Sequence, residues 1–149
     1  MTDTPKTIKV VFGGYWREPK VGSLPATAGI YCIYSCTYDE NYKPKPTVSI
    51  AKLLYIGEAA NVRDRVSNHD QWPAWKKQLT SGQVVCVSAA PVSPETSRQR
   101  AEAALIFKHK PPVNVEYAHS FPFDTTTINA TGETAKLTTT FTVKKDAKD

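Results

Sequence analysis

The chain has 149 residues, of which 40% are hydrophobic and 22% charged, values that are typical of an ordinary globular domain. No apolar run approaches the roughly 20 residues that cross a bilayer, and the N-terminal stretch MTDTPKTIKV lacks the apolar segment of a signal peptide. We therefore expect a single cytoplasmic domain over residues 1–149 that does not bind membranes. The net charge of +5 modestly favours a polyanionic partner, nucleic acid first.

The cysteines predict neither a disulfide framework nor a zinc site. Their number, three, is odd, and nothing marks the chain as secreted. Cys32 and Cys86 lie inside apolar runs, where a free cysteine commonly packs as a small core residue. The third, Cys36, belongs to no CxxC pair, so the spacing does not suit zinc.

Three strands are predicted in the first half of the chain from runs of β-branched and aromatic residues. They cover residues 7–12 (TIKVVF), 29–38 (GIYCIYSCTY) and 52–57 (KLLYIG). We expect a tight turn at Gly57 to end the third strand. The polar, proline-containing stretch at 39–50 is predicted to be a surface loop.

A helix is predicted next, over residues 61–69. Asn61 suits the N-cap position, and Asp64 falls in the first turn, where the helix dipole favours an acid. Arg65 and His69 are four residues apart, so both are expected on one stripe of this helix.

The remaining elements follow from similar signals. WPAWKKQL at 72–79 suggests a short helix, QVVCVSAAPV at 83–92 a strand, and Ser93 with Pro94 the start of a helix that runs to about Lys108. The threonine-rich tail contains the turn sequence NATGET between two strand-like runs, which predicts a β-hairpin within residues 120–143.

Glu102 is unusual within its predicted helix. It is the charged residue in the stretch AEAALIF, on a helix that must pack against the sheet. A carboxylate is costly to bury unless a cation or hydrogen-bond donors meet it. Glu102 therefore either points to solvent or binds a hard divalent cation, which prefers carboxylate oxygens.

The other candidate residues each have an ordinary structural interpretation. Tyr31 and Tyr55 could be core aromatics, Arg65 and His69 solvated helix residues, and Asn114 a turn residue. Taken together with Glu102, they suggest another interpretation. An acid that can hold a divalent ion, an arginine that can bind phosphate, and a histidine with two tyrosines that can move protons are what phosphodiester hydrolysis needs.

The order of these residues resembles a known family. GIY at 29–31 and YIG at 55–57 are followed by A-x-N-V-x-x-R-V-x-x-H, then by Glu102, KPP and Asn114. This pattern is similar to that of the GIY-YIG nuclease superfamily, which includes homing endonucleases, some restriction enzymes and the incision subunit of bacterial nucleotide excision repair. The resemblance covers residues 28–115. It implies an α/β (α+β) fold with a small central antiparallel sheet flanked by helices, to which the C-terminal hairpin is an addition.

The resemblance also implies a role for each candidate. Glu102 would hold one Mg²⁺ or Mn²⁺ ion, and Arg65 would bind the non-bridging phosphate oxygens. The proton of an attacking water would pass to His69 or to Tyr31, and Tyr55 would hold the nucleophile or the phosphate. Two supporting residues complete the set: Gly57 would let the backbone approach the substrate, and Asn114 would orient the metal site.

The expected function is that of a metal-dependent DNA endonuclease that nicks DNA, as a monomer or as a transient dimer on DNA. The alternatives are a nucleic-acid-binding module of the same fold with little or no catalysis, and a structural domain. Two features depart from the family pattern: an insertion at 38–50, and Glu58, an acid close to the expected phosphate site.

Overall fold

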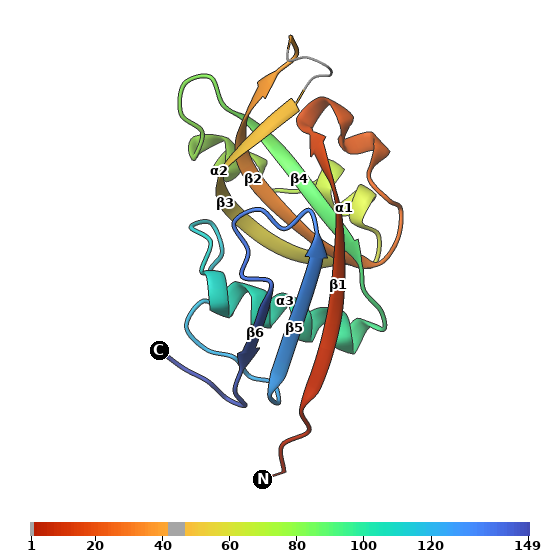
Figure 1. The fold of residues 1–149 in the computed structure, drawn as a ribbon, viewed down its shortest axis with the longest axis vertical. Coiled ribbons are helices and arrows are strands. Elements are labelled where there is room, and N and C mark those ends of the chain that lie inside the picture. The colour runs from red at the N-terminus through yellow and green to blue at the C-terminus, as the bar shows by residue number, and fades with distance from the viewer. Residues whose placement is uncertain (1, 42–46) are drawn as a thin grey trace.

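A curled β-sheet with helices on both faces forms the centre of the fold (Figure 1). The computed structural model describes residues 2–41 and 47–149. Six strands are found there: β1 (Lys6–Arg17), β2 (Gly29–Asp39), β3 (Thr47–Ala59), β4 (Val84–Pro91), β5 (Thr126–Gly132) and β6 (Thr140–Val143). They lie in the order β3-β2-β4-β1-β5-β6. The predicted α+β class is confirmed.

The sheet is mixed rather than purely antiparallel. β3, β2, β4 and β1 pair in antiparallel fashion, but β5 runs parallel to β1, from Lys6 opposite Thr126 to Phe12 opposite Gly132. The predicted C-terminal hairpin is therefore present as β5 and β6, and it extends the central sheet instead of lying outside it.

The helices divide between the two faces. One face carries η1 (Glu18–Ser23), α1 (Val62–Ser67) and α2 (Trp72–Lys77), and the other carries α3 (Glu95–His109), which Figure 1 shows lying behind β5 and β6. In β2, Tyr31 and Ile33 pack toward the first face, while Ile30, Cys32 and Tyr34 pack toward α3. Strand β2 is buried on both sides, which explains its continuous apolar sequence.

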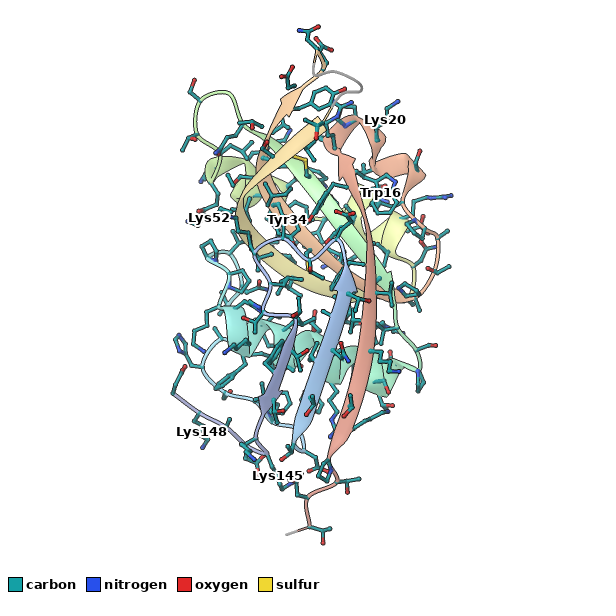
Figure 2. All side chains as sticks on the ribbon, in the orientation of Figure 1. Trp16, Lys20, Tyr34, Lys52, Lys145 and Lys148 are labelled. Atoms are coloured by element: carbon teal, nitrogen blue, oxygen red, sulfur yellow. A yellow bond between two sulfur atoms is a disulfide. The ribbon has the colours of Figure 1, made fainter. Side chains whose placement is uncertain are left out.

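Most apolar side chains lie between the layers and most charged side chains lie on the surface. Tyr34 lies inside the molecule, whereas the labelled lysines lie around its outside (Figure 2). In the part of the chain that the structure describes, each helix is too short or too polar to span a bilayer.

Several predicted boundaries are wrong. The stretch at 39–50 is not wholly a loop, because β3 already begins at Thr47; residues 42–46 lie outside the described part. Gly57 does not end β3 either. The strand continues to Ala59, which pairs with Gly29 at the start of β2. The longer helix begins at Glu95 after Pro94, one residue later than predicted.

The expectation of unpaired cysteines is also wrong. Cys36 on β2 and Cys86 on β4 form a disulfide between neighbouring strands, with a Cα–Cα distance of 6.4 Å. Their alignment depends on strand register, in which Cys36 faces Val84 and Cys86 faces Tyr34. Cys32 is free and buried, as predicted. Disulfides are uncommon in reducing compartments, so the cytoplasmic location stays a prediction.

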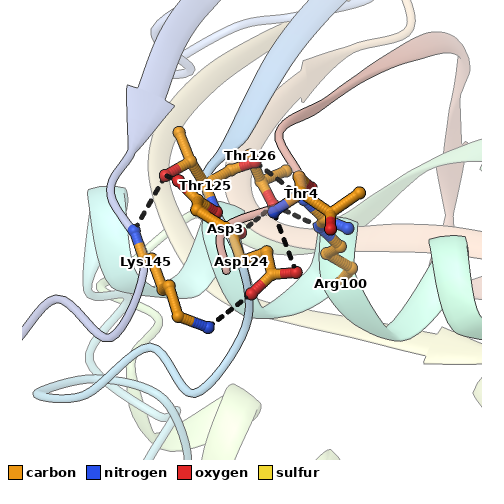
Figure 3. A network of polar contacts seen from close by, with 7 residues as sticks. All are labelled: Asp3, Thr4, Arg100, Asp124, Thr125, Thr126 and Lys145. Carbon is orange, nitrogen blue, oxygen red and sulfur yellow. Dashed lines mark hydrogen bonds and ion pairs between the residues drawn. The ribbon is translucent and has the colours of Figure 1, made fainter. Parts of the chain in front are cut away.

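A polar network fastens the hairpin to the rest of the fold (Figure 3). Arg100 of α3 donates to the backbone carbonyls of Thr4 and Thr125, at 2.8 and 2.7 Å. Asp124 accepts from the backbone N–H of Thr4 at 3.2 Å and from the Lys145 ammonium at 2.6 Å. The N-terminus, α3 and both ends of the hairpin therefore meet at one place.

Candidate active site

Gly57 allows Tyr31 to reach the edge of the sheet. The two residues are paired across β2 and β3. A Cβ atom on Gly57 would lie 2.3 Å from both Cζ and the hydroxyl oxygen of Tyr31, so any larger residue would displace the ring. Gly57 lies inside an extended strand rather than in a turn. Its structural effect is to leave room for the hydroxyl end of Tyr31.

Four aromatic rings pack around this point. The Tyr31 and Tyr55 rings are stacked, with centroids 6.3 Å apart and an interplanar angle of 27°. His69 lies edge-on to both, at 6.0 and 5.3 Å, and its ring is 4.6 Å from that of Trp75. The predicted proximity of the two tyrosines and His69 is thus found, with Trp75 of α2 as an additional neighbour.

His69 does not share a helix stripe with Arg65. Helix α1 has the predicted Asn61 cap, whose side chain accepts from the backbone N–H of Asp64 at 3.1 Å, but it ends at Ser67. His69 therefore turns inward and is only 5% exposed, whereas 47% of the Arg65 side chain remains exposed. The i, i+4 expectation fails because the helix is shorter than predicted.

The surroundings of His69 keep its ring neutral. Nδ1 accepts a hydrogen bond from the backbone N–H of Gln71 at 3.0 Å, which leaves the ring proton on Nε2. Burial, followed by the positive charge of Arg65, lowers the pKa of His69 to about 4. Nε2 is buried and has no hydrogen-bond partner. In this state the Nδ1 lone pair is occupied and Nε2 carries the proton, so neither nitrogen has a free lone pair.

Arg65 lies at the rim of the aromatic group. Its positive charge acts on the Tyr31 hydroxyl, and its guanidinium is 3.8 Å from a carboxylate oxygen of the exposed Asp70. A cleft of about 380 Å³ next to α1 is lined by both Arg65 and Glu58. Arg65 therefore presents a partly exposed cation to an open cleft, as phosphate binding requires.

The two tyrosine hydroxyls respond to charges from both sides of the site. Burial raises the pKa of Tyr31, the negative charge of Tyr55 would raise it further, and Arg65 opposes both effects. Burial also raises the pKa of Tyr55, with Glu102 adding to the effect and Arg65 opposing it. Arg65 and Glu102 are thus both close enough to act on the same hydroxyls, although they arise from opposite faces of the sheet.

Glu102 is partly buried on α3, which contradicts the interpretation that it points freely to solvent. Its carboxyl group is near enough to Glu58 for the backbone N–H and the charge of that residue to act on its pKa. Burial, together with the negative charges of Glu58 and Glu116, raises the pKa of Glu102 to about 8. The nearby positive charge is therefore too small to balance the negative charge that an ionised Glu102 would carry.

Glu58, the acid that departs from the family pattern, is paired with an arginine. Arg98 of α3 donates from Nε to a carboxylate oxygen of Glu58, and a second nitrogen of Arg98 lies 3.7 Å from the exposed Glu95. The Arg98 side chain is 6% exposed and that of Glu58 is 21% exposed. Sequence reasoning missed Arg98, whose one available signal was its i, i+4 spacing from Glu102.

Asn114 holds the edge of β3. Its side-chain oxygen accepts from the Ile56 N–H and its amide donates to the Ile56 carbonyl, both at 2.9 Å. Val113 adds a backbone bond to the carbonyl of Leu54 at 3.1 Å. Asn114 thus pairs with the residue between Tyr55 and Gly57, and this contact fixes the strand that carries them.

The residues present suit a weakly ligated ion. Among the described residues, no group of three or more histidine, cysteine or acidic side chains could enclose a metal. Mg²⁺, however, usually keeps several waters and takes one or two carboxylates together with substrate phosphate. Glu102, whose negative charge no neighbouring cation in the described part of the chain balances, fits a site of that kind.

Comparison with known proteins gives one partial match. A stretch of 96 residues, 64% of this chain, is 28% identical to UvrABC system protein C of Haloarcula marismortui and covers 15% of that protein. No protein-family model and no solved structure matches the chain. The match gives partial support to a nuclease of the GIY-YIG kind. The matched stretch spans under a sixth of the length of that relative.

Proposed function

We propose that this protein is a divalent-metal-dependent endonuclease that hydrolyses phosphodiester bonds in DNA, with nicking as the primary event. The observation that supports this most directly is the stacked pair of Tyr31 and Tyr55 at the C-terminal end of β3, where the charges of Arg65 and Glu102 act in opposite directions on the pKa values of the hydroxyls. This reaction needs a cation that binds phosphate, a carboxylate free to bind a metal ion, and hydroxyl groups that can move a proton.

In the proposed mechanism, Arg65 binds the non-bridging oxygens of the scissile phosphate from the cleft beside α1. It stabilises the negative charge that builds up at phosphorus, which is usually the largest catalytic contribution. Glu102 holds one Mg²⁺ or Mn²⁺ ion, which when bound supplies Lewis-acid polarisation of the phosphate and stabilises the leaving oxygen. Tyr55 orients the attacking water or the phosphate through its hydroxyl.

For the proton of the attacking water we propose a relay through the Tyr31 hydroxyl in place of transfer to His69: the hydroxyl oxygen accepts that proton while its own proton passes to a phosphate oxygen. Burial raises the pKa of Tyr31 far above its usual range and the positive charge of Arg65 opposes this only in part, so the hydroxyl keeps its proton until it can hand it on. His69 is neutral, but its Nδ1 lone pair is occupied by the Gln71 N–H. His69 then serves to support the stacked tyrosine rings.

One chain carries one such site, so we expect a single strand to be cut at each encounter. A double-strand cut would then require a transient dimer or a second binding event. Supercoiled plasmid is the suitable substrate, because a nick converts it to the open circle without passing through the linear form.

The test compares the parent protein with Glu102→Gln on supercoiled plasmid in Mg²⁺, Mn²⁺ and EDTA. We expect the parent to nick in either metal and not in EDTA. Glu102→Gln should abolish nicking, because one strong oxygen ligand and its charge are lost, while DNA binding persists or tightens. Folding should be unharmed, since burial raises the pKa of Glu102 to about 8 and the uncharged acid that predominates at neutral pH closely resembles glutamine in shape and charge.

Glu133→Gln provides the matched control, because it changes an exposed acid away from the site. It should leave nicking unchanged. If Glu102→Gln nicks at the parent rate, the metal assignment and the nuclease proposal both fail. If the parent shifts DNA on a gel but never cuts it in either metal, the protein is a nucleic-acid-binding module instead.

A further inference from the structure

The acid next to the proposed phosphate site is held by a buried ion pair. Glu58 directly follows Gly57 on β3, and Arg98 reaches it from α3 through an Nε–H···O contact. Both side chains are largely removed from water, at 21% and 6% exposure. A buried ion of one sign without its partner would be strongly unfavourable, so each residue requires the other.

Arg98 is also placed to affect Glu102. The two residues are one turn apart on α3, the spacing at which helix side chains can pair. In the structure the short contact of Arg98 goes to Glu58 and not to Glu102, although Glu102 is near enough to Glu58 for the charge of Glu58 to raise its pKa. Two carboxylates and one guanidinium thus share a small space, and the guanidinium is paired with the carboxylate on β3.

We propose that Glu58 and Arg98 are positioning residues: Glu58 holds the Arg98 guanidinium in an ion pair on β3 and so keeps it away from Glu102, which stays available to the divalent ion. This inference rests on the proposed function, because it concerns the ion site at Glu102. It explains how an acid can be tolerated beside the phosphate site: the charge of Glu58 is cancelled by an arginine that comes from the same helix as Glu102.

The proposal predicts opposite effects for the two members of the pair. Without Arg98, Glu58 becomes a second free carboxylate beside Glu102, so the ion binds more tightly while DNA phosphate is repelled. Without Glu58, Arg98 loses its partner and turns to Glu102, where it competes with the ion. When both Glu58 and Arg98 are replaced, neither an extra carboxylate nor a competing guanidinium is left beside Glu102, so ion binding should return to that of the parent.

The experiment titrates Mn²⁺ into the full-length parent, Arg98→Gln, Glu58→Gln and the double variant, with calorimetry as the readout. We expect Mn²⁺ to bind about fivefold or more tightly to Arg98→Gln and about fivefold or more weakly to Glu58→Gln, as for one charge interaction gained or lost. The double variant should return to within about twofold of the parent, since neighbouring changes couple rather than add.

Two variants act as controls. Arg98→Lys keeps the charge and should bind Mn²⁺ much like the parent. Glu95→Gln removes the other carboxylate that Arg98 approaches, which is 71% exposed and 3.7 Å away, and should have little effect. Melting temperatures are measured for every variant. If Arg98→Gln does not fold, the weaker binding expected of Glu58→Gln and the rescue by Arg98→Lys still test the proposal.

Shifts of the same sign in both single variants would overturn the positioning role, because that pattern indicates general disruption of the fold. Unchanged Mn²⁺ affinity in Glu58→Gln would overturn it as well. In either of these outcomes, the ion site at Glu102 would still be supported if the parent binds Mn²⁺ and Glu102→Gln does not. A parent that binds no Mn²⁺ would overturn both the ion site and the role of Arg98.

Discussion

Gly57 and Tyr31 show how one missing side chain shapes the site. The Tyr31 hydroxyl occupies the space where a Cβ atom on Gly57 would lie. The ring stays stacked on Tyr55 and in contact with His69 because β3 leaves this space open. The second glycine of the motif acts similarly: a Cβ on Gly29 would lie 2.1 Å from the Ala90 carbonyl oxygen of the neighbouring strand.

We predict that Gly57→Ala will lower the free energy of unfolding by about 1–3 kcal/mol, the usual cost of overpacking a well-filled core. Tyr31 must move, so nicking should fall as well. Gly22→Ala is the control, because nothing lies within 4 Å of its added Cβ, and its effect should stay within about ±0.5 kcal/mol. Chemical denaturation measures both. Equal stability of the two variants would contradict the close contact.

The choice between Tyr31 and His69 as proton acceptor also belongs to single residues. Tyr31→Phe keeps the stacked ring and removes the hydroxyl, so we predict a loss of nicking rate of about 10²-fold or more. His69→Phe keeps a ring beside Tyr31, Tyr55 and Trp75 and removes both nitrogens, so its loss should be below about 10-fold. Single-turnover rates at saturating Mg²⁺ measure each effect. The reverse ranking would assign the role to His69.

At the scale of elements, the pairing of β2 with β4 creates a bond that neither strand predicts alone. Cys36 and Cys86 are 50 residues apart in the chain and meet because the register of the two strands places them diagonally opposite each other. Strand β2 also carries Tyr31, so the disulfide ties the strand that bears the site to the centre of the sheet.

We predict that reducing the disulfide, or replacing both cysteines by serine, will lower the free energy of unfolding by up to about 4 kcal/mol, the loop-entropy value for a closure of this length. Denaturation with and without dithiothreitol measures the loss. The reductant should have no effect on the Cys36→Ser, Cys86→Ser double variant. An intact mass that shows three free thiols in the untreated protein would contradict the pairing.

At the scale of the whole molecule, the C-terminal hairpin completes the core. Phe141 and Val143 of β6, with Ile128 and Ala130 of β5, pack into the cluster beneath α3. The parallel pairing of β5 with β1 and the polar network at Arg100 join the hairpin to both ends of that layer. The hairpin is therefore expected to stabilise the fold rather than to act as a detachable DNA-binding arm.

We predict that Phe141→Ala will destabilise the protein by about 3–5 kcal/mol, as for other buried phenylalanines. Thr140→Ala, at the exposed neighbouring position, should change stability by no more than about 0.5 kcal/mol. Thermal and chemical denaturation, followed beside DNA binding, distinguish a structural hairpin from a binding arm. Loss of DNA binding by Phe141→Ala with unchanged stability would contradict the structural role.

The sequence by itself determined the local features, which are the central strands and the Asn61 cap. These depend on side-chain periodicity and on contacts within a few residues, which a sequence shows directly. The tertiary structure alone decided which distant residues meet. Arg98 reaches Glu58 from 40 residues away and Asn114 reaches Ile56 from 58. Such pairs depend on strand register and on the packing of α3, and no local pattern encodes either of these.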